Sequence, residues 1–247
     1  MPNLGVIGNK LKPIIIMVFI FILVAIVALW IWWKMTHYND SPWVKNRIKG
    51  RTDDQKAVIR YFCNDPACLS KKPISDEEYD AMVQAELDSQ NFKAKAIAKI
   101  GLDESEISEI EPVHFEGFQF DNKTNTLTKQ GDDGIYRSSK YQVSWIFFSA
   151  TQVYLYQNTF DMGEDGRKEA TEEYFYRDIT NFSTSTDTVE TPFYDKKTDK
   201  TILKNVDYNR FQLSAMGDKF YCSLEQNDYT EKAIQGMKSM LREKKNA

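Results

Sequence analysis

An uncharged apolar stretch of 20 residues, residues 14–33, constrains this chain more than any other feature. At about 1.5 Å per residue, a helix of this length spans roughly 30 Å, the thickness of the hydrocarbon core of a bilayer. A helix buried in a soluble core would show a polar face, and this stretch has none. The pattern predicts a transmembrane helix over residues 13–33, with Pro13 in its first turn, where a proline is tolerated.

Aromatic residues gather at the C-terminal end of this stretch, as they do where a helix leaves a bilayer. We expect six residues at the membrane interface: Trp30, Trp32, Trp33, Lys34, Tyr38 and Trp43. The alternative is a cleaved signal peptide, whose apolar region is roughly 7–15 residues long and ends in small residues. This stretch is longer and ends in tryptophans, so we interpret it as an uncleaved anchor that contacts the lipid bilayer.

Basic residues flank the anchor unequally. Lys10 and Lys12 precede it, whereas five lysines and arginines follow it within about 20 residues. Because an excess of positive charge marks the cytoplasmic side of a membrane, the count favours a single-pass protein with a cytoplasmic folded part. Lysines before a first helix also permit the opposite orientation, which stays open as an alternative.

The charges also divide along the length of the chain. Residues 1–53 hold seven basic and two acidic side chains, a net charge of +5, so the remaining residues carry −9 of the total of −4. We expect a flank (1–12), the anchor, a basic juxtamembrane linker (34–52) and an acidic folded region. We interpret the basic residues of the linker as the charges that ordinarily flank a transmembrane helix. The alternative is that they bind anionic lipid electrostatically. An acidic region disfavours nucleic-acid binding, which needs basic surfaces.

Residues 53–111 have the apolar spacing of helices. Either Asp53 or Asp54 is expected to cap the first of these helices. Ser75 and Glu78 have the spacing of a capping box, in which each side chain accepts a hydrogen bond from the backbone of the other residue. This part of the chain is therefore predicted to be a small helical segment.

Residues 112–247 form the predicted β domain with its C-terminal helix, and from residue 112 onward the apolar pattern changes to a period of two, which is typical of strands. Residues 141–148 and 151–158 form the clearest pair, joined by a tight turn. A final amphipathic helix follows, with Asp228 and Glu231 at capping-box spacing. The chain is thus predicted to be α+β, with an antiparallel barrel whose apolar mouth the C-terminal helix closes.

Two segments of this β region resemble a known superfamily. Residues 145–156 (WIFFSATQVYLY) and residues 174–182 (YFYRDITNF) are similar to consecutive strand segments of bacterial pleckstrin-homology-like (PH-like) and GRAM-like domains. The resemblance covers residues 113–245 and implies that Ile179 packs inward and that Asp178 shapes a turn. Another small barrel or sandwich with a terminal helix is the alternative.

The resemblance implies a non-catalytic binding or scaffolding module. It does not imply binding of a lipid headgroup, because the members that bind one carry basic residues in their first hairpin loop. Here the turn at residues 149–151 has no basic residue, and the region is acidic. A binding module implies a protein partner, so we expect one. The fold does not identify that partner, because one fold can serve many functions.

The sequence shows no catalytic, cofactor-binding or metal-binding pattern. Its two histidines, His37 and His114, lie apart from any nucleophile pattern, and no glycine-rich phosphate loop is present. Residues 161–172 approach the EF-hand spacing, but Gly163 replaces a ligand and the flanks have a strand pattern, so we interpret residues 161–166 as a charged hairpin turn.

Cys63 and Cys68 form a close pair without a second pair to complete a zinc site. Outside the cell they are expected to form a disulfide, and inside it free thiols.

Three functional hypotheses follow. The leading one is a membrane-anchored, non-catalytic interaction module that acts through an acidic PH-like domain. The second is an extracytoplasmic binding or sensor domain with a Cys63–Cys68 disulfide. The third is a hydrolase that uses two carboxylates, although no pair stands out.

Overall fold

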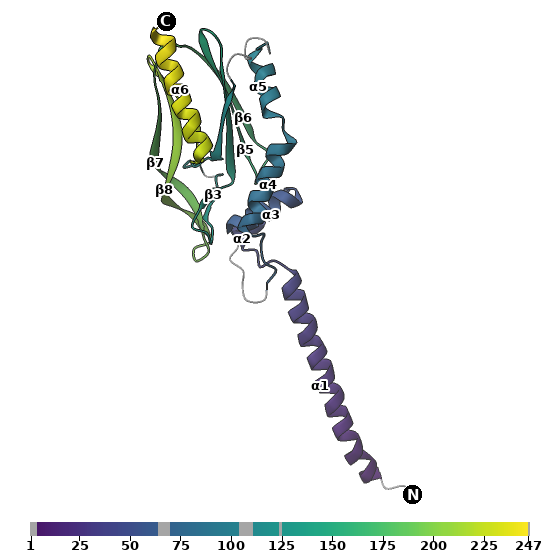
Figure 1. Ribbon diagram of the computed structural model, residues 1–247. Coiled ribbons are helices and arrows are strands. Elements are labelled where there is room, and N and C mark those ends of the chain that lie inside the picture. The colour runs from purple at the N-terminus through teal and green to yellow at the C-terminus, as the bar shows by residue number, and fades with distance from the viewer. Residues whose placement is uncertain (1–3, 64–69, 104–110, 124, 247) are drawn as a thin grey trace. The chain divides into compact units, whose positions relative to one another are not determined.

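The computed structural model describes residues 4–63, 70–103, 111–123 and 125–246, and the chain divides into two compact units (Figure 1). The first unit comprises residues 1–41 and 64–73, and the second comprises residues 42–63 and 74–247.

Helix α1 (Leu4–Thr36) dominates the first unit. Its apolar part, Ile16–Thr36, has 21 residues with a mean hydropathy of 2.8, and none of them is buried. A helix of this length and composition is compatible with a transmembrane helix or with a signal sequence. The helix begins nine residues before Pro13, so the expectation that Pro13 lies in its first turn is wrong. An interior proline removes only one backbone hydrogen bond, and the flanking residues continue the helix.

Four helices open the second unit: α2 (Pro42–Arg47), α3 (Asp53–Cys63), α4 (Asp76–Ser89) and α5 (Phe92–Ile100). Helix α2 lies within the predicted linker and starts at Pro42, and its Val44 is fully buried. The capping box of Ser75 and Glu78 is confirmed. Helix α3 is capped instead by Thr52, whose hydroxyl accepts a hydrogen bond from the N–H of Gln55 at 3.2 Å, and not by either aspartate that follows.

Within the residues that the structure describes, nine strands form two sheets. The first sheet has the order β1 (Val113–Phe118), β4 (Lys140–Phe148), β5 (Gln152–Asp161), β6 (Arg167–Phe175). The second has the order β3 (Tyr136–Ser138), β2 (Thr128–Gln130), β7 (Ile179–Asp195), β8 (Lys200–Ala215), β9 (Asp218–Ser223). All pairings are antiparallel except the contact of β2 with β7, and the predicted hairpin of β4 and β5 is confirmed.

The two sheets do not close into the predicted barrel; no continuous backbone ladder joins them within the described parts of the chain. Side-chain amides bridge the gap instead. The Oε1 of Gln142 accepts a hydrogen bond from the N–H of Ser223 at 2.7 Å, and the Nε2 of Gln157 donates one to the carbonyl of Tyr221 at 2.8 Å. These two hydrogen bonds connect β4 and β5 of the first sheet with β9 of the second.

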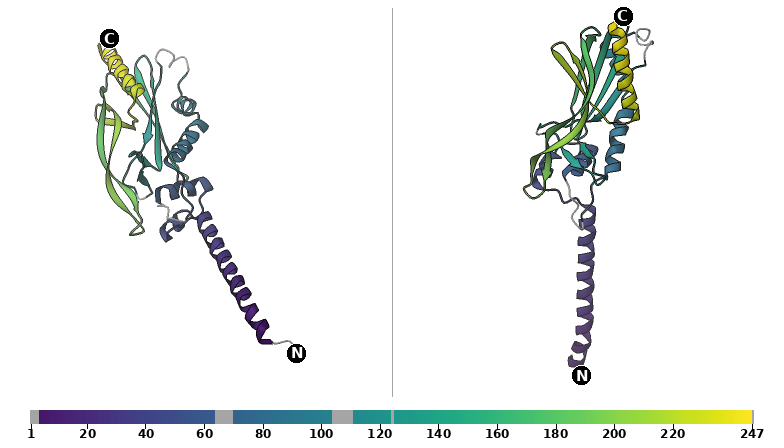
Figure 2. Two further views of the ribbon diagram at one scale, coloured as in Figure 1. Left: turned by 60° about the horizontal axis from the view of Figure 1, so that its bottom comes forward. Right: turned by 60° about the vertical axis from the view of Figure 1, so that its left-hand side comes forward.

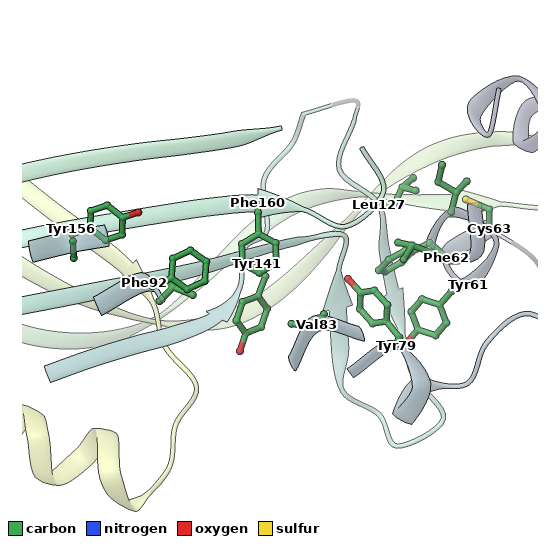
Figure 3. Close-up of a cluster of buried hydrophobic side chains, with 14 of the residues drawn as sticks. Tyr61, Phe62, Cys63, Tyr79, Val83, Phe92, Leu127, Tyr141, Tyr156 and Phe160 are labelled. Carbon is green, nitrogen blue, oxygen red and sulfur yellow. The ribbon is translucent and has the colours of Figure 1, made fainter. Parts of the chain in front are cut away.

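Other elements cover both faces of the first sheet (Figure 2), and a hydrophobic core lies on each side of it. Helices α3, α4 and α5 cover one face, and their core includes Tyr61, Tyr79 and Phe160 (Figure 3). The second sheet and the C-terminal helix α6 (Asp228–Asn246) cover the other face. Strand β4 lies between the two cores, which explains why it is buried along almost its whole length.

Helix α6 packs the buried side chains of Ile234, Met237 and Leu241 onto this second core. The expected cap at Asp228 is one residue too late. Asn227 caps the helix, because its side chain accepts a hydrogen bond from the N–H of Thr230 at 2.9 Å, while the hydroxyl of Thr230 accepts one from the N–H of Asn227 at 3.0 Å.

Candidate functional site

A cleft of about 460 Å³ lies where α4, β1, β3, β4 and β8 meet. Aromatic rings form much of its wall, and the charged groups are four carboxylates and one guanidinium, a formal charge of −3. We call it the acidic cleft, and its aromatic and charged lining residues are Phe118, Phe120, Tyr136, Tyr141, Tyr208, Asp80, Glu116, Asp207, Glu225 and Arg137.

Strand alternation places the acidic residue of β1 in this cleft. Phe115 points into the core against the second sheet, so Glu116 and Phe118 point to the opposite face, toward α4. The N–H of Glu225 donates to the carbonyl of Glu116 at 3.0 Å, which holds the two glutamates on adjacent segments. Asp207 joins them from β8 and accepts a hydrogen bond from Thr188 at 2.6 Å.

The environment shifts the protonation of the cleft. Burial, together with the negative charges of Glu225 and Asp88, raises the pKa of Glu116. Burial and the carboxylates of Glu116 and Glu225 raise the pKa of the Tyr141 hydroxyl. The raised pKa values of Glu116 and Tyr141 have the same two causes, burial and neighbouring carboxylates. A cation that enters would relieve this repulsion.

Arg137 does not neutralise the other carboxylates of the cleft, because its guanidinium already forms ion pairs with two aspartates. Its side chain is only 4% exposed and binds Asp80 at 2.7 Å and Asp133 at 2.8 Å. Hydrogen bonds from Arg137 and from the backbone hold the pKa of Asp133 down to about 2. The arginine therefore ties α4 to the β2–β3 hairpin and fixes one wall of the cleft.

A larger cavity of about 620 Å³ lies among α3, α4 and the β5–β6 turn, and its lining holds five carboxylates and one guanidinium. Arg51 binds Glu164 at 2.9 Å, Gln55 binds Asp165 at 2.7 Å, and Arg167 pairs with Glu86. Phe160 is the one aromatic residue among the lining residues of this cavity, whereas five aromatic residues line the acidic cleft. Because aromatic faces add attraction for a cationic side chain, the acidic cleft is the better candidate.

The residues expected at the membrane interface fall in both units. Trp30, Trp32, Trp33 and Lys34 lie in α1 and Tyr38 follows it, and the Nζ of Lys34 lies 5.2 Å from the centre of the Trp30 ring. Trp43 belongs to the second unit instead. Its N–H donates to Asp199 at 3.2 Å and its ring lies 5.4 Å from that of Tyr194, so β7 and the β7–β8 turn hold it in place.

The cysteine pair is placed only in part. Cys63 is buried at the end of α3, and Cys68 lies outside the described residues, so their redox state stays a prediction. The third cysteine, Cys222, is buried in β9, and burial raises the pKa of its thiol to about 12. A protonated, inaccessible thiol is a poor nucleophile.

The EF-hand-like segment is the turn between β5 and β6, which confirms the hairpin interpretation. The Oδ1 of Asp161 accepts a hydrogen bond from the N–H of Gly163 at 2.8 Å. Over the parts of the chain that the structure describes, no three His, Cys, Asp or Glu side chains are grouped as metal ligands.

His114 lies between two aromatic residues. Its ring stacks on Trp145 at 4.9 Å, its Nδ1 lies 3.3 Å from the hydroxyl of Tyr229, and burial lowers its pKa.

Sequence patterns did not reveal the acidic cleft, because its residues come from one helix, four strands and the loops beside them, spread over about 150 positions. One signal was present: Glu116 lies between apolar residues in a strand whose two faces are both covered. No family of known proteins matches this chain, and no curated protein or solved structure matches it either.

Proposed function

We propose that this protein is a single-pass, membrane-anchored and non-catalytic interaction module, which binds a basic segment of a protein partner in the acidic cleft. The observation that carries the proposal is the cleft itself, with a formal charge of −3 and a guanidinium already bound to two carboxylates. The second unit is proposed to lie on the cytoplasmic side, where the excess of basic residues after the anchor would place it.

The proposed anchor is α1. Its exposed apolar part of 21 residues is long enough to cross a bilayer at about 1.5 Å per residue, and Lys34 beside Trp30 suits a membrane interface. Alkaline carbonate extraction of native membranes followed by N-terminal sequencing tests it. Retention in the membrane with residues 1–33 intact is expected, whereas a mature chain that begins after residue 33 would identify a signal peptide.

The order of strands supports the PH-like part of the proposal. Strands β1, β4, β5 and β6 form a four-stranded antiparallel meander, β7, β8 and β9 form a three-stranded one, and α6 follows. This is the plan of a PH-like domain with the short β2–β3 hairpin inserted after its first strand. In the absence of a match to a solved structure, the fold family stays a proposal that rests on topology.

The lining of the cleft favours a lysine or arginine side chain as its occupant. Carboxylates attract the charge, and aromatic faces add cation–π attraction of about 0.5–2 kcal/mol. Because the pKa of Glu116 is raised, part of the attraction depends on its ionisation. Binding of a basic peptide is therefore expected to strengthen as the pH rises through the pKa of Glu116.

Fluorescence anisotropy with the full-length protein in lipid nanodiscs tests the cleft. The probe is an arginine-rich peptide, and a glutamate-rich peptide of equal length is the negative control. The variant Glu116→Gln/Asp207→Asn/Glu225→Gln is expected to bind the arginine-rich peptide at least about tenfold more weakly, which corresponds to a loss of about 1.4 kcal/mol.

A control variant separates the cleft from general attraction. Glu173→Gln/Glu190→Gln/Glu243→Gln removes the same charge at exposed positions elsewhere on the unit and is expected to bind like the wild type. An equal loss in both variants would show that net charge, and not the cleft, governs binding. Turnover of a substrate that depends on Glu116 would overturn the non-catalytic assignment.

A further inference from the structure

The long hairpin of β7 and β8 ends beside α2, at the end of the second unit where that unit's chain begins (Figure 1). Asp199, in the turn of the hairpin, accepts a hydrogen bond from the N–H of Trp43 at 3.2 Å and another from the hydroxyl of Tyr194 at 2.9 Å. Val44 of α2 is fully buried next to this contact. The hairpin turn is therefore fixed to the first residues of the unit.

This contact sets an upper limit on how far the hairpin turn can be from α1. Trp43 is seven residues beyond Thr36, the last residue of α1. A fully extended chain of seven residues spans at most about 25 Å. In any arrangement of the two units, the turn therefore stays close to the end of the apolar helix.

The charge of this end of the unit is opposite to that of the rest of the chain. Residues 42–52 hold four basic residues and no acidic one, and residues 195–204 hold four lysines and two aspartates, so together they carry +6. The remainder of the chain must then carry −10 of the total of −4. The two aspartates of the turn form hydrogen bonds with groups of the protein, among them Thr198 and Trp43, while Lys197 and Lys200 are exposed.

Apolar side chains accompany these lysines. Ile202 and Leu203 are 39% and 55% exposed at the start of β8, next to Lys200 and Lys204. Exposed aliphatic side chains among lysines are typical of segments that dip into the headgroup region of an anionic bilayer.

We infer that the β7–β8 turn is a second membrane contact, which binds anionic lipid through Lys197 and Lys200 and inserts Leu203 among the headgroups. The inference rests on the proposed membrane anchor. In this proposal the basic linker and the hairpin form one membrane-binding surface, although about 150 residues separate them in the sequence. The contact would hold the second unit in one orientation on the bilayer and leave its acidic remainder directed away from anionic lipid.

Depth-dependent fluorescence quenching of the full-length protein tests the contact. A fluorescent amino acid replaces Leu203 or, as a control, Met216, which is 77% exposed in the turn at the other end of β8. The vesicles contain a lipid with a spin label near the headgroup, in phosphatidylcholine alone or mixed with phosphatidylglycerol. Quenching is expected at position 203 in the mixture, with little in phosphatidylcholine and little at position 216 in either.

Charge reversal provides the matched control. Lys197→Glu/Lys200→Glu is expected to abolish the quenching at position 203, whereas Lys219→Glu/Lys232→Glu, which makes the same change at exposed lysines elsewhere, is expected to leave it unchanged. If the protein floats with vesicles but position 203 is not quenched in the mixture, the hairpin contact is wrong and the anchor stands. If the protein floats with neither type of vesicle, the anchor and the inference both fail.

Discussion

Two aspartates of the second unit, Asp76 at the start of α4 and Asp161 at the end of β5, differ in how many hydrogen bonds their carboxylates accept. Asp76 is buried and accepts hydrogen bonds from the hydroxyl of Tyr61 at 2.7 Å, the N–H of Asp132 at 2.8 Å and the Nζ of Lys129 at 3.4 Å. Asp161 is half-buried and bonds through Oδ1 to the N–H of Gly163, while no described residue donates to its buried Oδ2.

The pKa values of the two carboxyls reflect this difference. Burial alone would raise the pKa of Asp76, but the hydrogen bonds from Tyr61 and from the backbone of Asp132, with the charge of Lys129, outweigh it and lower the pKa. Burial raises the pKa of Asp161 to about 6, because the one bond from Gly163 does not compensate it. Partners therefore decide whether a buried carboxylate stabilises or destabilises the fold.

Removing the better-supported carboxylate is expected to have the largest effect. Asp76→Ala leaves the hydroxyl of Tyr61, the N–H of Asp132 and the ammonium of Lys129 without their acceptor. The free energy of unfolding is expected to fall by about 3–5 kcal/mol. Urea unfolding of the full-length protein in detergent micelles measures it, and a loss below about 1 kcal/mol would show that water replaces the carboxylate.

Acid should also reveal the contribution of Asp76. Its lowered pKa means that its stabilisation is complete above the pKa of the unfolded chain, about 3.9, and is lost as the pH falls through the lower folded value. The sign for Asp161 is reversed, since its raised pKa makes the fold less stable as the pH increases from about 4 to 6.

Neutralising Asp161 is therefore expected to stabilise the protein. Asp161→Asn keeps an oxygen for the N–H of Gly163 and removes the buried charge. At pH 7 the free energy of unfolding is expected to rise by about 3 kcal/mol, because the pKa is raised from 3.8 to about 6 and each unit is worth about 1.4 kcal/mol. At pH 4 the variant and the wild type are expected to unfold alike. Destabilisation at both pH values would mean that a donor reaches Oδ2 in solution.

A single donor to Asp76 should matter less than the carboxylate. Tyr61→Phe removes the hydroxyl but keeps the ring, which stacks on Tyr79 at 4.7 Å. The loss is expected to be about 1.5 kcal/mol, the contribution of one hydrogen bond to a charged group. Combining it with Asp76→Ala in a double-mutant cycle should show a total loss well below the sum, because both changes remove the same bond.

Local features of the fold were predictable from the sequence, and long-range ones were not. The capping box at Ser75 and the hairpin of β4 and β5 depend on residues a few positions apart, so their patterns are visible. The bond between Asp76 and the N–H of Asp132 joins residues 56 positions apart, and no spacing rule indicates it. The acidic cleft escaped prediction for the same reason.

The β7–β8 hairpin shows another limit of pattern analysis. In its first half, Phe182 and Phe211 face the core beneath α6, whereas nearer its turn Val189 and Val206 pack from the opposite face against Phe120. One face of the hairpin is buried in the half nearer α6, and the opposite face is buried in the half nearer the turn. The apolar residues therefore do not keep to one set of alternate positions along either strand. Alternation alone thus does not show which face of these strands is buried.

The smallest change in unfolding free energy is expected for an aspartate that forms an ion pair but is exposed to solvent. Asp53 binds the Nζ of Lys56 at 3.0 Å with 98% of its side chain exposed, and this bond lowers its pKa. Water solvates both ions equally well when they separate, so Asp53→Asn is expected to leave urea unfolding unchanged. A loss of unfolding free energy as large as that of Tyr61→Phe would show that an ion pair alone stabilises an aspartate in this protein. Burial would then not explain why Asp76 contributes more than the exposed Asp53.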